Sequence, residues 1–100
     1  MAARIAIDRD ALRRFCERSG IRKLSLFGSV LTDAFTEASD VDVLVEFEPD
    51  RRVGLLGLAG MEIELSEMIG RKVDLRTPAE LSRYFRRDVL DRAEVQVARG

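Results

Sequence analysis

Two aspartates two positions apart, Asp40 and Asp42, are the residues of this sequence best suited to bind a metal ion. They alternate with Val41, Val43 and Val45, a pattern that predicts a strand with both carboxylates on one face and the valines on the other. A rise of ~3.3 Å per residue places the two carboxylates roughly 7 Å apart. Mg²⁺ is usually held by one or two carboxylates together with substrate phosphates and water. The pair is therefore a candidate magnesium site, and the alternative is two solvated residues at the start of a strand.

Gly28 and Ser29 end the apolar run at residues 24–27 and begin a polar loop. A glycine at the end of a strand lets a ligand approach the backbone without a Cβ in the way. A serine at this point can cap a following helical turn, whose N–H groups bind anions and above all phosphate. A phosphate-binding turn beside metal-binding carboxylates indicates phosphoryl or nucleotidyl transfer. The alternative is an ordinary strand-to-helix turn with a serine cap.

A third carboxylate, Asp74, lies between apolar residues in a segment that is expected to form a strand. A buried carboxylate needs a partner or a metal ion. If Asp74 faces Asp40 and Asp42, three like charges share one pocket, and a bound cation relieves their repulsion. The alternative is an ion pair with Arg76 or Lys72 at the end of the strand.

The elements expected to position these residues alternate between helices and strands. Periodicity, caps and glycine stops predict helices at residues 8–19, 54–69 and 77–92, and strands at residues 22–27, 41–47 and 72–76. The last helix is expected to break near Ser82, and residues 94–100 are expected to form a frayed tail. We expect Leu55, Phe85 and Leu90 to face the core. Three strands with three or four helices predict an α+β fold with one small mixed sheet, in a single domain at residues 1–100.

The composition excludes several kinds of site. The chain has one cysteine, Cys16, and no histidine, which excludes an internal disulfide, a zinc site of the His/Cys type and a histidine general base. A net charge of −1 argues against direct binding of nucleic acid. The apolar runs are far too short for a membrane span and no secretory leader is recognised, so we expect no membrane partner and a cytoplasmic location.

The order Gly-Ser, ten residues, Asp-x-Asp resembles the signature of the polymerase-β-type nucleotidyltransferase superfamily. The segments DVDVLVEFEP and GRKVDL are similar to its smallest prokaryotic branch, the minimal nucleotidyltransferases encoded beside HEPN-domain ribonuclease toxins. The resemblance covers about residues 22–92. It implies the polymerase-β-like fold and two sets of site residues. Those that bind the metal and act in catalysis are Asp40, Asp42 and Asp74, and those that bind the nucleotide are Gly28 and Ser29.

The resemblance also implies an activity and a partner. The activity is that of a protein adenylyltransferase that uses Mg²⁺ or Mn²⁺ and moves AMP from ATP to a hydroxyl group, with Asp74 orienting or deprotonating that hydroxyl. The implied acceptor is a tyrosine of the HEPN-type toxin, and the modification would make this chain the antitoxin. A single small domain has no room for a second substrate-binding module, so the acceptor hydroxyl must come from another protein.

One position departs from the pattern of this branch. Relatives often have arginine in the order GS-x-x-R, whereas this chain has Thr32 there. Arg51 and Arg52 are candidates to replace the missing arginine. The departure favours the alternative reading, in which the chain is a weakly active or inactive antitoxin that neutralises the toxin by binding it.

Overall fold

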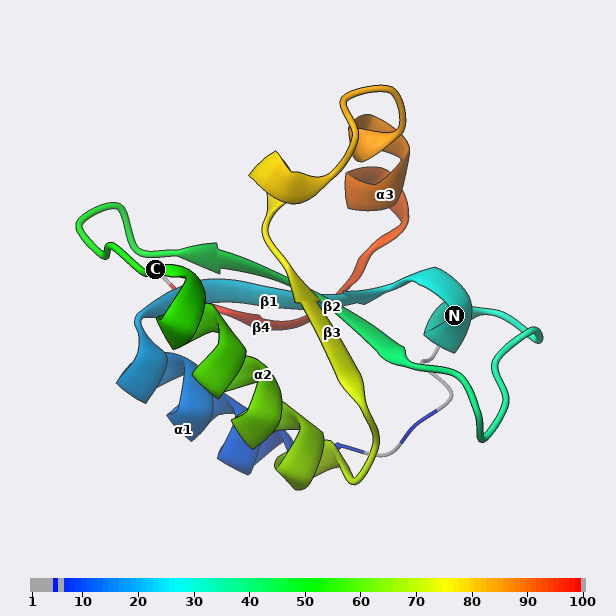
Figure 1. The fold of residues 1–100 in the computed structure, drawn as a ribbon, viewed down its shortest axis with the longest axis horizontal. Coiled ribbons are helices and arrows are strands. Elements are labelled where there is room, and N and C mark those ends of the chain that lie inside the picture. Colours follow the sequence, from blue (N-terminus) through cyan, green and yellow to red (C-terminus); the bar gives the residue numbers. More distant parts are fainter. Residues whose placement is uncertain (1–4, 6, 100) are drawn as a thin grey trace.

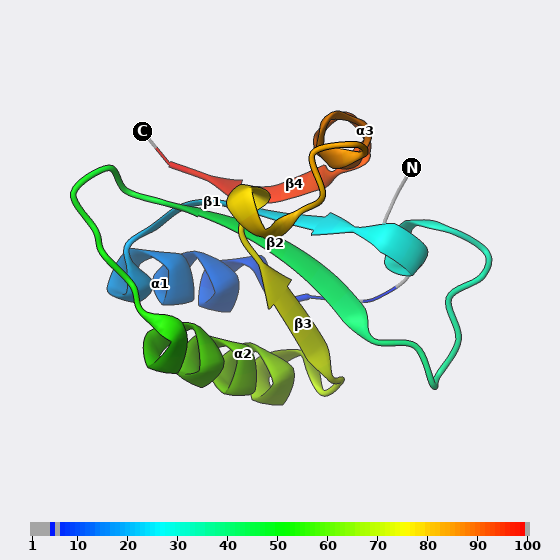
Figure 2. The ribbon, with the colours of Figure 1, turned by 45° about the horizontal axis from the view of Figure 1, so that its top comes forward.

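The computed structural model describes residues 5 and 7–99 of the chain. Its helices and strands, in order, are α1 (Arg9–Ser19), β1 (Ile21–Phe27), β2 (Val41–Phe47), α2 (Leu55–Ile69), β3 (Val73–Arg76), α3 (Arg86–Arg92) and β4 (Glu94–Ala98). Two 3₁₀ turns, η1 (Gly28–Leu31) and η2 (Pro78–Glu80), follow β1 and β3. The strands form one sheet in the order β3-β2-β1-β4. In Figure 1 and Figure 2, α1 and α2 cover one side of this sheet, and α3 lies on the other side.

The sheet is mixed because two kinds of connection build it. β1 is antiparallel to both β2 and β4, whereas β2 and β3 are parallel. A parallel pair needs a crossover, and α2 provides it. Val41, Val43 and Val45 of β2 are fully buried in the core formed with α1 and α2. The alternate residues of β2 therefore face the side on which α3 lies. The predicted α+β fold with one small mixed sheet is confirmed.

The first helix has the caps that its sequence predicts. The Asp8 carboxylate accepts hydrogen bonds from the backbone N–H groups of Asp10 (3.0 Å) and Ala11 (3.1 Å). Gly20 ends the helix in the left-handed region at φ 71°. Cys16 is completely buried, and burial raises the pKa of its thiol to about 11. This cysteine is therefore a core residue and stays protonated at neutral pH.

The outer edge of β3 is covered by side chains of α2. The N–H of Val73 donates to Ser66 Oγ (3.0 Å), and the N–H of Leu75 donates to Glu62 Oε2 (2.8 Å). The Glu62 carboxylate thus satisfies a backbone donor that the edge strand would otherwise leave unpaired.

The C-terminal segment differs most from what its sequence predicts. The segment expected to fray forms β4, which pairs with β1 and buries Val97. The alternating order of Val95 and Val97 is a strand signal, but the segment is short and polar apart from these residues. Its order depends on pairing with β1, which lies far away in the sequence.

The helices also differ from expectation in which residues they bury. Leu55 is 83% exposed and Phe85 is 53% exposed, and Leu90 is exposed as well, so none of the three faces the core as expected. The last predicted helix is divided into η2 and α3, and a capping box formed by Thr77 and Glu80 is present at the start of η2. Among the described residues, no helix has both the length and the apolar character that crossing a membrane requires.

Candidate active site

One end of the sheet brings together residues from all four strands. Asp42 of β2 lies opposite Asp74 of β3 in the parallel register and opposite Phe27 of β1 in the antiparallel register. Glu94 begins β4 at the same end, opposite Leu26. The paired aspartates project from the same side of the sheet, because directly opposed residues of neighbouring strands share a face.

The carboxylate of Asp42 lies directly against the backbone of Gly28. Gly28 has φ 78°, in the left-handed region that side chains disfavour, and a Cβ added to it would overlap Asp42 Oδ2. Both the conformation and the space therefore require glycine at this position. The end of β1 and the start of β2 are thus joined by an aspartate packed on a glycine.

Like charges surround the Asp42 carboxylate. Burial raises its pKa above the ordinary value of 3.8, and the nearby carboxylates of Asp74 and Asp40 raise it further, while Arg76 lowers it. Two neighbouring anions that both raise this pKa show that the three carboxylates share a local field. A cation at this point would relieve the repulsion.

The two outer carboxylates are turned toward cations of the protein. Asp74 forms an ion pair with Arg76 (3.2 Å), and Asp40 forms one with Lys72 (3.9 Å). Within the part of the chain that the structure describes, no three acidic, histidine or cysteine side chains are arranged as a ready set of metal ligands. The donors are nevertheless hard carboxylate oxygens of the kind that Mg²⁺ and Mn²⁺ prefer, so the residue types fit such an ion.

The turn after β1 is held by its own hydrogen bonds. The carbonyl of Ser29 accepts from both the N–H and the Oγ1 hydroxyl of Thr32, each at 2.9 Å, and Thr32 Oγ1 accepts from the N–H of Ala34 (3.2 Å). Ser29 lies inside the turn, and Phe27 holds the N-cap position, so the expectation that serine caps the turn was wrong. Thr32 closes the turn, which accounts for a hydroxyl at this position.

Arg71, which the sequence analysis missed, fastens the loop that leads to Asp40. Its Nη2 donates to the carbonyls of Thr36 (2.5 Å) and Ser39 (3.0 Å), and its guanidinium lies over the ring of Phe35 at 4.4 Å from the centroid. The only signal in the sequence is its place beside the strand of Asp74. Arg71 is therefore a positioning residue for the loop.

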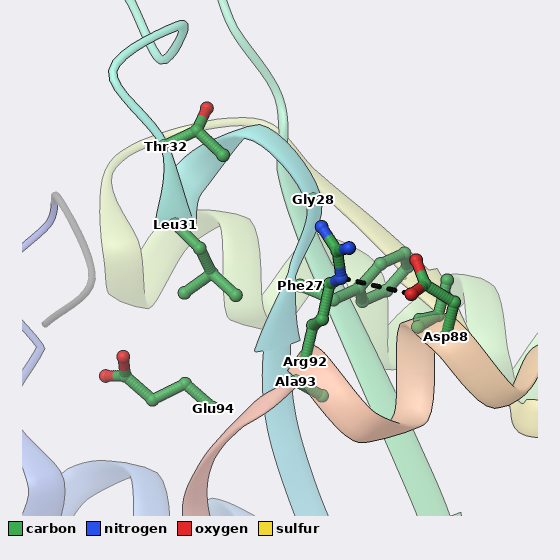
Figure 3. A pocket seen from close by; sticks show the side chains of 9 residues that line it. Phe27, Gly28, Leu31, Thr32, Asp88, Arg92, Ala93 and Glu94 are labelled. Atoms are coloured by element: carbon green, nitrogen blue, oxygen red, sulfur yellow. Dashed lines mark ion pairs between the residues drawn. The ribbon is translucent and has the colours of Figure 1, made fainter. Parts of the chain in front are cut away.

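A cavity of about 720 Å³ opens beside Gly28 on the side of β1 that leads to β4. The residues that line it are Phe27, Gly28, Leu31, Thr32, Asp88, Val89, Arg92, Ala93 and Glu94. Figure 3 shows Arg92 reaching from α3 toward Phe27 and Gly28, with its Nε paired to Asp88 Oδ1 at 3.1 Å. Arg51, a candidate replacement for a loop arginine, instead lies against Gly20 at the opposite end of β1.

The sequence matches known proteins over most of its length. Residues 9–95 match a family model described as a nucleotidyltransferase domain. A Methanocaldococcus jannaschii protein named as a protein adenylyltransferase is 33% identical over 76 residues, which are 76% of this chain and 80% of that protein. The protein adenylyltransferase MntA of Thermococcus cleftensis is 36% identical over 74 residues, which are 74% of this chain and 73% of that protein.

Solved structures share the fold. A structure described as a minimal nucleotidyltransferase is 35% identical and matches with a TM-score of 0.70 over 85% of each chain. A structure of a tri-AMPylated Shewanella oneidensis HEPN toxin in complex with MNT antitoxin matches with a TM-score of 0.65, over 90% of this chain and 69% of the matched one. At 15% identity, this second likeness concerns the fold alone.

Proposed function

This chain belongs to the nucleotidyltransferase domain family, and we propose that it transfers AMP from ATP to a hydroxyl group of a partner protein. The observation that carries the proposal is the Asp42 carboxylate, which lies against Gly28 and has Asp74 and Asp40 beside it. This arrangement joins a site of concentrated negative charge to a backbone turn with no side chain at its first residue. The first suits a cation and the second suits a phosphate.

We assign the roles of the individual residues from this geometry. Asp40, Asp42 and Asp74 would hold Mg²⁺ or Mn²⁺, which when bound supplies charge neutralisation to the phosphates of ATP. Gly28, which has no side chain, lets the Asp42 carboxylate lie against the turn, so that a metal ion held there would be close to β- and γ-phosphates at Ser29. Both exposed ion pairs, of Asp74 and of Asp40, contribute little stability and leave these carboxylates available.

The chemical step moves one group between two oxygen atoms. The acceptor oxygen forms a bond to the α-phosphorus of ATP, the bond from that phosphorus to the bridging oxygen of the β-phosphate breaks, and pyrophosphate leaves with the electron pair. Asp74 takes up the proton of the acceptor hydroxyl as the attack proceeds. The chain holds both reactants close together and in line, which is the main contribution that an enzyme makes to nucleotidyl transfer.

We propose that the acceptor is a HEPN-domain ribonuclease toxin and that a tyrosine hydroxyl receives the AMP. Two relatives are named as protein adenylyltransferases, and a structure of the same fold is described as an antitoxin in complex with an AMPylated HEPN toxin. An added AMP introduces bulk and negative charge near an RNA-binding surface, where it repels the RNA backbone. The modification would thus neutralise the toxin and make this chain its antitoxin.

A second candidate function is an antitoxin that acts by binding alone. Thr32 favours it, because the η1 turn contains no basic residue that could contact a triphosphate. The two candidates differ in one outcome. Only the first adds mass to the partner.

The test combines this chain with the HEPN protein of its own organism, ATP and Mg²⁺. We expect mass spectrometry to show one or more adducts of AMP mass on the partner and the ribonuclease activity of the partner to fall. Omitting ATP or Mg²⁺ is the matched control and should leave the partner unmodified. Inhibition of the ribonuclease without any adduct would reject AMP transfer and favour the binding antitoxin.

A further inference from the structure

The phosphate end of the candidate site is short of positive charge. The η1 turn has no basic side chain, and the hydroxyl of Thr32 is engaged with the carbonyl of Ser29. The adjoining carboxylate of Asp42 is itself in a negative field from Asp74 and Asp40. A bound triphosphate adds further negative charge at this point, so its terminal phosphates need a cation that the turn does not provide.

The cavity beside Gly28 offers one such cation. Arg92 is the one basic residue among those that line it. Its side chain is 78% exposed and is held by an i,i+4 ion pair with Asp88, which is also exposed. Figure 3 shows its guanidinium reaching from the last turn of α3 toward Gly28. An exposed pair of this kind is weak, so the guanidinium can exchange its partner without loss of the fold.

The other arginines around α3 are committed elsewhere. Arg86 donates to the carbonyls of Ala79 (3.4 Å) and Leu81 (2.8 Å) and braces the segment before α3. Arg87 pairs with Asp91 at 3.6 Å. Neither residue lines the cavity.

We propose that Arg92 binds the terminal phosphates of ATP across this cavity, an assignment that rests on the proposed nucleotidyl transfer. A guanidinium presents a planar fork of N–H donors that matches phosphate oxygens. Phe27 and Val89 contribute apolar walls to the cavity beside this guanidinium. The cation that the η1 turn lacks in sequence thus comes from a helix more than fifty residues further along the chain.

The test separates terminal phosphates from the rest of the nucleotide. The full chain and its variants Arg92→Gln and Arg92→Lys are titrated with ATP and with AMP in Mg²⁺, and the Kd of each is measured by calorimetry. A charge-assisted contact that is lost should raise the Kd for ATP roughly 10- to 100-fold in Arg92→Gln. The Kd for AMP should stay unchanged, because AMP has no terminal phosphates. Arg92→Lys should lie between the wild type and Arg92→Gln.

Arg87→Gln is the matched control, because it removes an arginine from the same helix with the same i,i+4 pairing but outside the cavity. It should bind ATP as the wild type does, and circular dichroism melts should show all variants folded. Equal losses for ATP and AMP in Arg92→Gln, or no loss for either, would overturn the assignment. If Arg92→Gln fails to fold, the measurements on Arg92→Lys decide. An Arg92→Lys variant that binds ATP as tightly as the wild type, with the same ratio of ATP to AMP affinity, would overturn the assignment.

The proposed transfer can fail separately from this assignment. A wild-type chain that binds ATP but adds no AMP to the toxin would reject the transfer, while the role of Arg92 in binding is still read from the ratio of affinities. A wild-type chain that binds no ATP would reject both.

Discussion

Strand β1 has a glycine at each end, and the two ends of the sheet use them differently. Gly20 and Gly28 both have positive φ, and each has a charged side chain in the space where a Cβ would stand. At Gly20 it is the guanidinium of Arg51, on a long side chain that can move aside. At Gly28 it is the carboxylate of Asp42, on a short side chain fixed to the neighbouring strand. Gly20 ends helix α1, and Gly28 leaves room for the Asp42 carboxylate.

The acidic residues at the two ends of β2 differ in the charges that surround them. Glu46, on the same face of β2 as Asp42, is paired with Arg22 (3.5 Å) and Lys23 (3.9 Å). Asp42 instead has two carboxylates as neighbours, and Arg76, the cation that lowers its pKa, is paired with Asp74. At one end of the strand a single carboxylate has two cations, whereas at the other end three carboxylates share the two cations Lys72 and Arg76. An excess of negative charge of this kind is typical of a site that acquires its counter-charge from a ligand.

The largest expected effect on AMP transfer comes from removing the charge of Asp42, and removing the charge of Glu46 at the other end of the strand is the control. Asp42→Asn should reduce AMP transfer by about 10²–10³-fold, the usual cost of removing one preorganised electrostatic group. Glu46→Gln removes a carboxylate of the same strand face and should leave the transfer rate within about twofold of the wild type. The rate is measured from incorporation of radiolabelled AMP into the toxin, and binding of the toxin should survive in both variants. Equal rates of AMP transfer in Asp42→Asn and Glu46→Gln would contradict the proposal that only the Asp42 end of the strand takes part in the reaction.

The glycines offer the next test. Gly20→Ala and Gly28→Ala both place a side chain in the left-handed region, so each should cost roughly 1–2 kcal/mol of folding stability. For a domain of this size, about 1 kcal/mol corresponds to a fall in Tm of about 4–8 °C. Only Gly28→Ala displaces Asp42, so only this variant should also lose AMP transfer. The two measurements are thermal melts and transfer rates well below Tm, and a loss of transfer in Gly20→Ala as well would mean that destabilisation alone accounts for it.

Divalent cations should act on one end alone. Mg²⁺ or Mn²⁺ at 100 times its Kd would stabilise the folded chain by about 2.7 kcal/mol and raise its Tm. The double variant Asp40→Asn/Asp42→Asn should lose this response, whereas Glu46→Gln should keep it. Differential scanning calorimetry with Mg²⁺ and with chelator measures the effect. A metal response unchanged in the double variant would contradict a cation site at this end.

The smallest effect expected is on the pH dependence of stability. Because the pKa of Asp42 is raised in the folded state, the folded chain binds this proton more tightly than the unfolded chain does. The stability that this provides is fully present below the unfolded value near 3.8 and is lost as the pH rises through the folded pKa. Without metal, Asp42→Asn should therefore gain stability relative to the wild type as the pH rises through that window. Urea unfolding at several pH values measures the difference, and a gap that stays constant or closes would show that folding does not raise the pKa of Asp42.

The candidate residues could be identified from the sequence because the pattern of a short segment is enough to single them out. The alternation from Asp40 to Val45 specifies which side chains share a face, and a strand of that register keeps the two sets apart wherever it is placed. Asp74 has the same property within its own strand. Gly28 was identifiable because a glycine at the end of an apolar run marks a change of backbone conformation. These are properties of short segments, and the observed bounds of α1 and β2 agree closely with those predicted.

Tertiary structure alone decided the partners of those residues. β4 is ordered by pairing with β1, Arg71 reaches the Asp40 loop from the turn before β3, and Arg92 lies beside Gly28 because α3 leads into β4. Each of these contacts joins segments tens of residues apart, and a local pattern carries no information about which distant group fills a given space. The sequence thus determined which side chains are candidates for the chemistry and which face of each strand they occupy. The packing of the chain decided that Lys72 and Arg76 restrain Asp40 and Asp74 and that the Asp42 carboxylate lies against Gly28, because charge–charge contacts depend on position in space rather than on order along the chain.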